Sequence, residues 1–67
     1  MDKKKIAERL VELRGRRTQK EIAEKLGISI ASIAMYENGK RMPRDEVKLA
    51  IAELYGESIQ YIFFDGK

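Results

Sequence analysis

The stretch Thr18-Gln-Lys-Glu-Ile-Ala-Glu-Lys-Leu-Gly-Ile-Ser-Ile-Ala-Ser-Ile-Ala-Met-Tyr-Glu-Asn38 decides the fold of this chain. It begins with Thr18 and Glu21 at the spacing of a capping box, in which each side chain accepts a hydrogen bond from the other residue's backbone N–H. The apolar residues that follow repeat at i, i+1 and i+4, which places them on one face of a helix over residues 19–26. Gly27 then supplies the left-handed backbone that ends a helix without a Cβ penalty.

A second helix is predicted over residues 29–38, because Ser29 can cap its start and because Ile33 and Tyr36 fall on one face. Two short helices joined by so tight a turn must cross steeply, as the two helices of a helix-turn-helix do. The central stretch therefore predicts a helix-turn-helix, and the segments on either side are expected to support it.

Three further helices are predicted around this unit, over residues 3–14, 44–55 and 58–63. The first two end at glycines, Gly15 and Gly56, and all three have apolar residues at helical spacing. The apolar stripes are Ile6, Ala7, Leu10 and Leu13; Val47, Ala50, Ile51 and Leu54; and Ile59, Ile62 and Phe63. The expected fold class is all-α, with five short helices in one domain over residues 1–67.

Composition excludes several classes of protein. The chain has 67 residues and contains neither cysteine nor histidine, so disulfides, zinc fingers and the commonest metal and acid–base sites are not expected. We therefore predict no metal and no cofactor. No apolar run approaches the roughly 20 residues that cross a bilayer, and no signal peptide is evident, so a cytoplasmic protein without membrane contact is expected.

Positive charge is concentrated on both sides of the central stretch. Residues 1–20 hold eight Lys and Arg against three acidic residues, and residues 40–44 hold three cations and no acid. Residues 21–39 and 45–67 are both net negative. This distribution suits a polyanion such as nucleic acid, although a basic excess of this size is also common on a solvated protein surface.

The sequence resembles the lambda-repressor-like helix-turn-helix family of the Cro/CI (Xre) type, small DNA-binding regulators of bacteria and phages. The resemblance covers residues 6–63 and rests on Gln19, Glu21-Ile-Ala23, Leu26-Gly27-Ile28-Ser29, Ile33, Tyr36-Glu-Asn-Gly39, Pro43 and Ile51-Ala52. It implies the compact five-helix fold of that family, with the helix-turn-helix formed by the second and third helices and with Ile28 in the core.

The resemblance also implies roles for individual residues. The third helix would enter the major groove of double-stranded DNA. Base reading would fall to Ser29, Ile30, Ala31, Ser32, Ala34 and Met35. Phosphate contacts would come from Thr18, Gln19 and Lys20 at the start of the second helix, and from Asn38, Lys40, Arg41 and Arg44 after the third. An ion pair between Arg14 and Glu37 would tie the first helix to the end of the third, the alternative for Glu37 being a plain solvated acid.

Two features depart from the usual pattern of the family. The connection Gly15-Arg-Arg17 is short, so Arg16 and Arg17 either approach the DNA backbone or fill the corner between two helices. The groove-facing positions are apolar where relatives often carry Gln, Arg or Asn. Three interpretations stay open: the face reads thymine methyl groups and DNA shape, it binds a protein partner, or the register is wrong by one residue and Ile30 lies in the core.

The function that this pattern favours is a sequence-specific repressor that binds a palindromic operator as a homodimer. So short a chain must dimerise through exposed parts of the same domain, for which the candidates are Tyr55, Tyr61, Ile62 and Phe64; alternatively, Ile62 and Phe63 only close the core of the monomer. The alternative function is a protein-interaction module of an antitoxin or antirepressor kind. An enzyme is not expected, because no Cys, His or enclosing cleft is available, and no small-molecule ligand is apparent.

Overall fold

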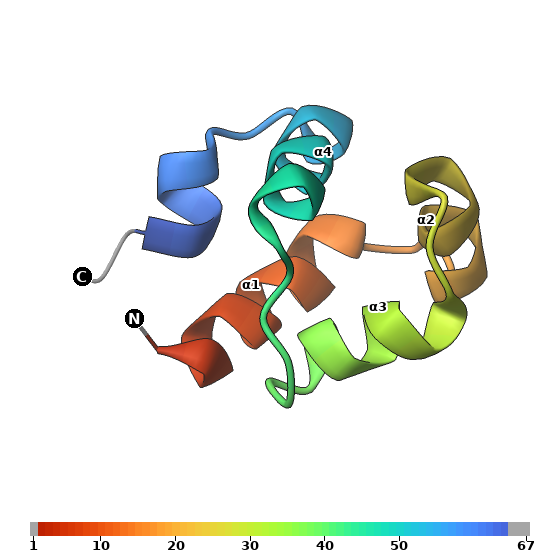
Figure 1. Cartoon of the computed structure of the whole chain (residues 1–67), viewed down its shortest axis with the longest axis horizontal. Helices are drawn as coiled ribbons and strands as arrows, with labels where there is room; N and C mark the ends of the chain where they lie inside the picture. Colours follow the sequence, from red (N-terminus) through yellow and green to blue (C-terminus); the bar gives the residue numbers. More distant parts are fainter. Residues whose placement is uncertain (1, 65–67) are drawn as a thin grey trace.

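Five helical segments account for most of residues 2–64, the part of the chain that the computed structural model describes (Figure 1). They are α1 (Lys3–Arg14), α2 (Gln19–Leu26), α3 (Ile30–Glu37), α4 (Asp45–Tyr55) and η1 (Gln60–Phe64), of which η1 is a single π-helical turn. The fold class is therefore all-α, as predicted, and α1 and α2 have the predicted bounds.

The other three helices differ from their predicted bounds at the ends. The predicted helix over 29–38 is one residue shorter at each end, because Ser29 and Asn38 are its caps. The helix predicted to begin at residue 44 begins at Asp45, since Arg44 has extended backbone and forms the N-cap. The last helix spans Gln60–Phe64 instead of residues 58–63, because Ser58 precedes it as a cap whose Oγ accepts from the amide of Tyr61 at 3.0 Å.

Local hydrogen bonds explain where the first two helices begin. The capping box of α2 is confirmed: Thr18 Oγ1 accepts from the amide of Glu21 at 3.0 Å, and Glu21 Oε1 accepts from the amide of Thr18 at 3.1 Å. Helix α1 has a cap that the sequence pattern did not predict, in which Asp2 Oδ1 accepts from the amides of Lys4 and Lys5. Each cap satisfies N–H groups that have no partner inside the helix.

The turn between α2 and α3 has the predicted chemistry. Gly27 has φ +70°, in the left-handed region, and the amide of Ile28 donates to the carbonyl of Ala23 at 3.0 Å. Ser29 Oγ then accepts from the amide of Ser32 at 3.1 Å and caps α3. Because the turn is this short, α2 and α3 are neighbours in space (Figure 1).

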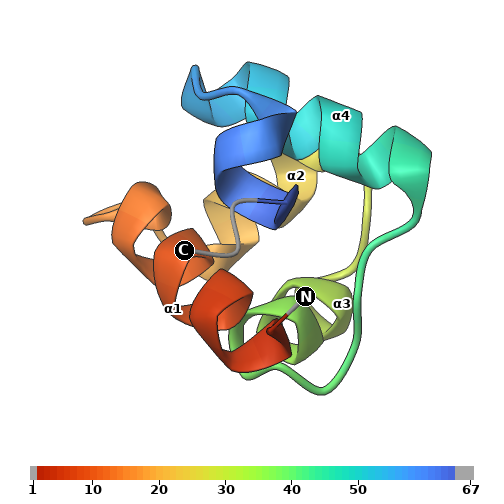
Figure 2. The ribbon, with the colours of Figure 1, turned by 90° about the vertical axis from the view of Figure 1, so that its left-hand side faces the viewer.

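The core draws on all five helices. The buried apolar residues of the described helices are Ile6, Ala7, Leu10, Ile22, Ala23, Ile33, Tyr36, Ile51, Ala52, Ile62 and Phe63. Ile28, which was expected in the core, is only partly buried and packs against this cluster. Helix η1 closes the core between α1 and α4 (Figure 2). None of the helices in residues 2–64 is long and apolar enough to span a bilayer.

The buried side of α4 is rotated from the predicted stripe. Among the four predicted residues only Ile51 is fully buried, whereas Ala52 and Lys48 are buried unexpectedly, Lys48 with 8% of its surface exposed. The reason is η1, because the Lys48 ammonium lies 5.1 Å from the ring centre of Phe64 and 5.8 Å from that of Phe63. Aromatic faces attract a cation, which makes this burial tolerable.

The turn after α3 has left-handed backbone at Gly39, beside the start of α1. Gly39 has φ +77°, and a Cβ atom built on it would lie 3.4 Å from the carbonyl oxygen of Lys3 and 3.8 Å from Cβ of Ala7. The backbone angle therefore favours glycine at this position, whereas the distances to α1 are those of ordinary van der Waals contact.

Candidate nucleic-acid interface

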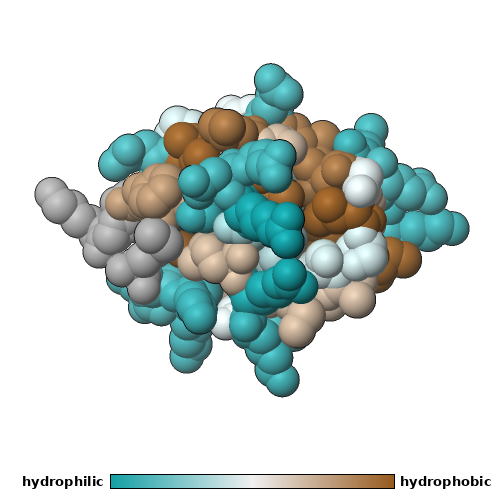
Figure 3. Space-filling model, in the orientation of Figure 1, coloured by the Kyte–Doolittle hydropathy of each residue, from teal (hydrophilic) through white to brown (hydrophobic). Residues whose placement is uncertain are grey.

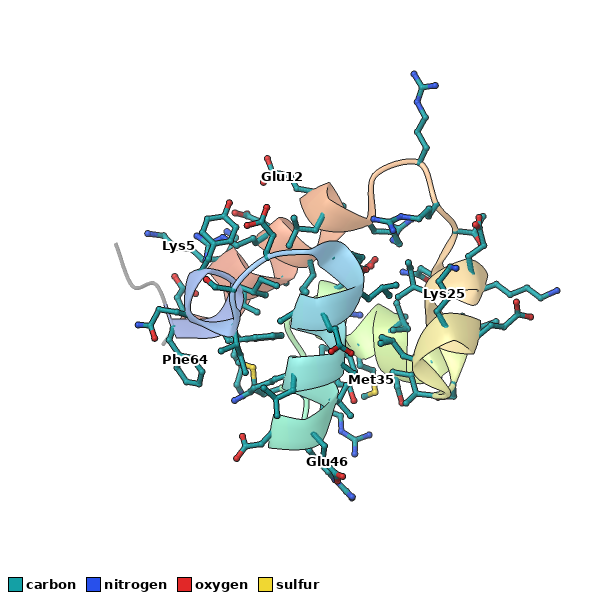
Figure 4. All side chains as sticks on the ribbon, turned by 90° about the horizontal axis from the view of Figure 1, so that it is seen from above. Lys5, Glu12, Lys25, Met35, Glu46 and Phe64 are labelled. Carbon is teal, nitrogen blue, oxygen red and sulfur yellow. The ribbon has the colours of Figure 1, made fainter. Side chains whose placement is uncertain are left out.

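The outward face of α3 is apolar and open. Ile30 exposes 47% of its surface and Met35 38%, while Ile33 and Tyr36 on the opposite side are buried. Ala31 is exposed, and Ala34 is half-buried between the two sides. The interpretation that Ile30 lies in the core is wrong, because Ile33 occupies the inward position of that turn. Figure 4 shows Met35 on this helix.

Few polar groups are available on this face. Ser29 Oγ accepts from the amide of Ser32 and also donates to Ser32 Oγ at 3.0 Å, so its hydroxyl is used within the helix cap. Ser32 is half-buried. Residues 30–36 include no amide and no charged side chain. The candidate reading residues thus offer little besides carbon, sulfur and one hydroxyl.

Cations stand at the C-terminal end of α3. The carbonyl of Met35 accepts from the amides of both Lys40 at 3.0 Å and Arg41 at 3.3 Å, and Asn38 Oδ1 accepts from the amide of Lys40 at 3.1 Å. These bonds fold the chain back on α3, so both cationic residues begin from a fixed backbone. Both side chains are exposed, which suits contact with phosphate.

Arg44 belongs to the same surface. Arg41 and Arg44 line one hollow of about 220 Å³, which Ile28 and Tyr36 of the helix-turn-helix also line. The connection between α3 and α4 therefore lies beside the helix-turn-helix. In Figure 3 a hydrophilic band follows this connection, with apolar surface on either side of it.

The start of α2 provides a second group of phosphate candidates. The first intrahelical bond of α2 runs from the amide of Ile22 to the carbonyl of Thr18, so the amides of Gln19 and Lys20 precede it at the positive end of the helix. Lys20 is exposed. Gln19 is half-buried, and its Nε2 donates to Glu37 Oε1 at 2.9 Å. Nε2 carries two hydrogens, so one remains for a phosphate.

Glu37 joins the ends of three helices. Its Oε2 accepts from Arg14 Nε at 2.8 Å, and its other oxygen accepts from Gln19. The side chain of Glu37 is 6% exposed and that of Arg14 20%, so the interpretation of Glu37 as a plain solvated acid is wrong. The hydrogen bond to Glu37 raises the pKa of Arg14 further above its ordinary value. Burial, and secondly the Glu37 carboxylate, raises the pKa of Tyr55.

Arg17 fills the corner between α1 and α2. Its Nη2 donates to the carbonyl of Leu13 at 2.8 Å and its Nε to that of Arg14 at 3.2 Å, which satisfies carbonyls at the C-terminal end of α1. The guanidinium also lies 5.1 Å from the ring centre of Tyr55 on α4. Arg16, by contrast, is exposed. Of the two interpretations of this pair, corner filling applies to Arg17.

The candidate dimer residues divide into two groups. Ile62 cannot form part of an outer surface, because it is fully buried with 0% exposed, and this candidate is corrected. Tyr55 is half-buried. Tyr61 and Phe64 are exposed, because they point away from the side of η1 that carries Ile62 into the core. Figure 4 shows Phe64 at one end of the molecule, well separated from Met35.

Two residues have supporting roles that the sequence pattern did not predict. Arg9 Nη1 donates to the carbonyl of Tyr61 at 2.6 Å, and its guanidinium lies 4.7 Å from the ring of that tyrosine. Lys48 lies against the rings of η1 from the other side. Neither role has a local sequence signal, because the partners are distant in the chain. The sequence feature that indicates such contacts is the group of aromatic residues in the last helix.

A comparison with family models finds that the helix-turn-helix model matches residues 8–62. The chain belongs to the Cro/CI-type helix-turn-helix family. Neither the curated proteins nor the solved structures include a significant match to it. Membership indicates a DNA-binding regulator, and the family is not typically enzymatic. The matched range contains α2, α3 and the connection with its exposed cations.

Proposed function

We propose that the protein is a dimeric, sequence-specific repressor that reads the major groove with α3. The observation that carries this proposal is the exposed face of α3 with exposed cations beside it, Lys40 and Arg41 after the helix and Lys20 at the start of α2. An exposed helix face of this kind fits the groove, and cations beside it neutralise phosphates of the DNA backbone. On this proposal the base-reading and phosphate-contacting residues are those that the family resemblance assigned.

Dimerisation is proposed through η1. Tyr61 and Phe64 are exposed there, and Arg9 and Lys48 hold η1 against α1 and α4. A symmetric dimer would place two copies of α3 about 34 Å apart, one turn of DNA, and would require a palindromic operator. We place the protein in the cytoplasm of a bacterium, encoded by the host or by a phage, without a cofactor.

The test is selection of bound duplexes from a random pool at about 50 and about 200 mM salt, together with the mass of the free protein in solution. A palindromic enriched sequence, a dimer mass and an affinity that falls steeply with salt are expected, because each phosphate contact releases counterions. A flat affinity between the two salt concentrations would contradict the proposal.

Substitutions then separate phosphate contacts from base reading. Replacing Lys40 and Arg41 together by Ala should weaken all sequences alike and reduce the salt slope by about two, one for each lost contact. The matched control replaces Lys5 and Lys25, which are exposed on other parts of the surface (Figure 4). If the control weakens binding as much, the contacts are not specific to this connection.

A second candidate function rests on the same apolar face. Exposed Ile30 and Met35 on successive turns also suit a protein partner, as in an antitoxin or antirepressor. This function is favoured if the selection enriches no sequence while the protein still binds a partner through α3.

A further inference from the structure

We propose that α3 recognises the 5-methyl group of pyrimidines and therefore reads 5-methylcytosine and thymine as equivalent. The inference rests on the proposed DNA-binding function and specifies what that function reads. It depends on which chemical groups the outer face of α3 presents and on which groups it lacks.

The face lacks the side chains that identify purines by hydrogen bonds. Discrimination of guanine or adenine in the major groove uses bidentate Arg, Lys, Asn or Gln, and residues 30–36 include none of these. The Ser29 hydroxyl is already bonded to the amide and the Oγ of Ser32. Only the Ser32 hydroxyl keeps a hydrogen to donate, and it is half-buried. Direct readout by hydrogen bonds is therefore reduced to one group.

The face does present an apolar surface of defined shape. Ile30 is β-branched and so nearly fixed at χ1 within a helix, Ala31 and Ala34 allow the backbone to approach closely, and Met35 can adapt to a neighbouring group. The thymine methyl is the apolar group among the major-groove edges of the four bases. An apolar face gains most where it covers such a methyl.

Thymine and 5-methylcytosine carry this methyl on the same ring atom. They differ in the adjacent group, which is the O4 acceptor in thymine and an N4 donor in cytosine. A hydrogen-bonding side chain would separate the two, whereas the carbon and sulfur atoms of Ile30 and Met35 do not. The face should therefore distinguish methylated from unmethylated pyrimidines and not one methylated pyrimidine from the other.

The occupant of this face is duplex DNA on grounds of charge. Lys40, Arg41 and Arg44 are exposed beyond the C-terminal end of α3, and Lys20 is exposed at the start of α2. No acidic side chain stands on α3 before Glu37, whose carboxylate is held by Arg14 and Gln19. An apolar strip with exposed cations beside it matches a methyl-bearing groove floor beside a phosphate backbone.

The test uses the duplex enriched by selection, with its thymines replaced one at a time. Deoxyuridine, which lacks the methyl, should weaken binding about fourfold at each contacted thymine, the factor corresponding to burial of one methyl-sized group. At the same positions 5-methylcytosine paired with guanine should bind within about twofold of thymine paired with adenine. Unmethylated cytosine paired with guanine should be about fourfold weaker.

The protein variants assign the effect to α3. The thymine-to-uracil factor is the ratio of the affinities for the thymine duplex and the uracil duplex. Ile30→Ala and Met35→Gln should each reduce this factor toward one at a contacted position. Circular dichroism checks that both variants fold. Leu49→Ala, which removes an exposed apolar side chain from α4, is the control and should leave that factor unchanged.

The outcomes distinguish the inference from the function on which it rests. An enriched operator that binds equally with thymine and uracil at every position overturns methyl reading but leaves DNA binding intact. Binding of 5-methylcytosine at the level of cytosine overturns the equivalence, and unchanged factors in both α3 variants overturn the assignment to this face. Failure to enrich any sequence, with capture of a protein partner by α3, overturns both.

Discussion

Glu37 is expected to be the most sensitive polar residue for stability. Its carboxylate accepts from Arg14 at 2.8 Å and from Gln19 at 2.9 Å, and the side chain is 6% exposed. The change Glu37→Ala removes both bonds and leaves Arg14 without its carboxylate. A hydrogen bond to a charged group contributes about 1.5–3 kcal/mol, and breaking a fully buried ion pair costs about 3–5 kcal/mol.

The expected loss lies at the lower end of these values. Arg14 keeps a fifth of its side chain exposed, so water can partly replace the lost partner. We expect the free energy of unfolding to fall by about 2–3 kcal/mol, which in a domain of this size lowers Tm by roughly 10–20 °C. The total stability of such a domain is only about 3–10 kcal/mol, so the variant should be close to its folding limit.

Urea unfolding followed by far-ultraviolet circular dichroism measures the loss. Glu24→Ala is the matched control, because Glu24 is an exposed acid on α2 and its removal changes the net charge equally. The control should stay within about 0.5 kcal/mol of the parent protein. A double-mutant cycle with Arg14→Ala should give a coupling energy of about 1–2 kcal/mol. Equal losses for Glu37→Ala and Glu24→Ala, or additive losses in the cycle, would refute the reasoning.

Three other predictions concern pH, two glycines with positive φ and a buried cation. The pKa of Tyr55 is raised in the folded state, so the contribution of its protonated form to stability is complete below about pH 10 and is lost as pH rises through the folded pKa. Thermal melts between about pH 9 and 12 should show this loss of stability, and the Tyr55→Phe variant should not show it. Gly39→Ala and Gly27→Ala should each destabilise by about 1–2 kcal/mol, since both have positive φ and an added Cβ meets at most ordinary contacts; a loss in urea several times larger at Gly39 than at Gly27 would contradict this reasoning. Lys48→Met should change the free energy of unfolding by less than about 1 kcal/mol, because the packing of the side-chain stem is retained. Lys48→Ala should lower the free energy of unfolding by more, and chemical denaturation of both variants measures the difference.

Much of the fold follows from local sequence signals. The Thr18 and Glu21 capping box, the left-handed Gly27 and the Ser29 cap were predicted from residues no more than four positions apart, and the structure contains each of them. Helical periodicity also identified the inward positions of α1, α2 and α3. These features are predictable because their hydrogen bonds and faces are set by neighbours along the chain.

The rotation of α4 and the form of the last helix were not predictable in this way. Ile51 is buried as predicted, but Ala52 and Lys48 are buried as well, and the aromatic rings of η1 lie against Lys48. Ile62 was placed among the dimer candidates because a periodic stripe does not say which of two surfaces it meets. Only the docking of η1 on the core decides that Ile62 is inside and that Phe64 is outside.

The candidate interface shows the same division. A helix-turn-helix, neighbouring cations and an apolar third helix are all predictable from the sequence, because residue type and spacing along one helix are local properties. Only the packing of the helices shows that Ile30 faces outward, that Arg17 fills the corner between α1 and α2, and that Glu37 binds both Arg14 and Gln19. Those outcomes depend on contacts between side chains that lie far apart in the sequence, and such contacts form only when the helices pack together.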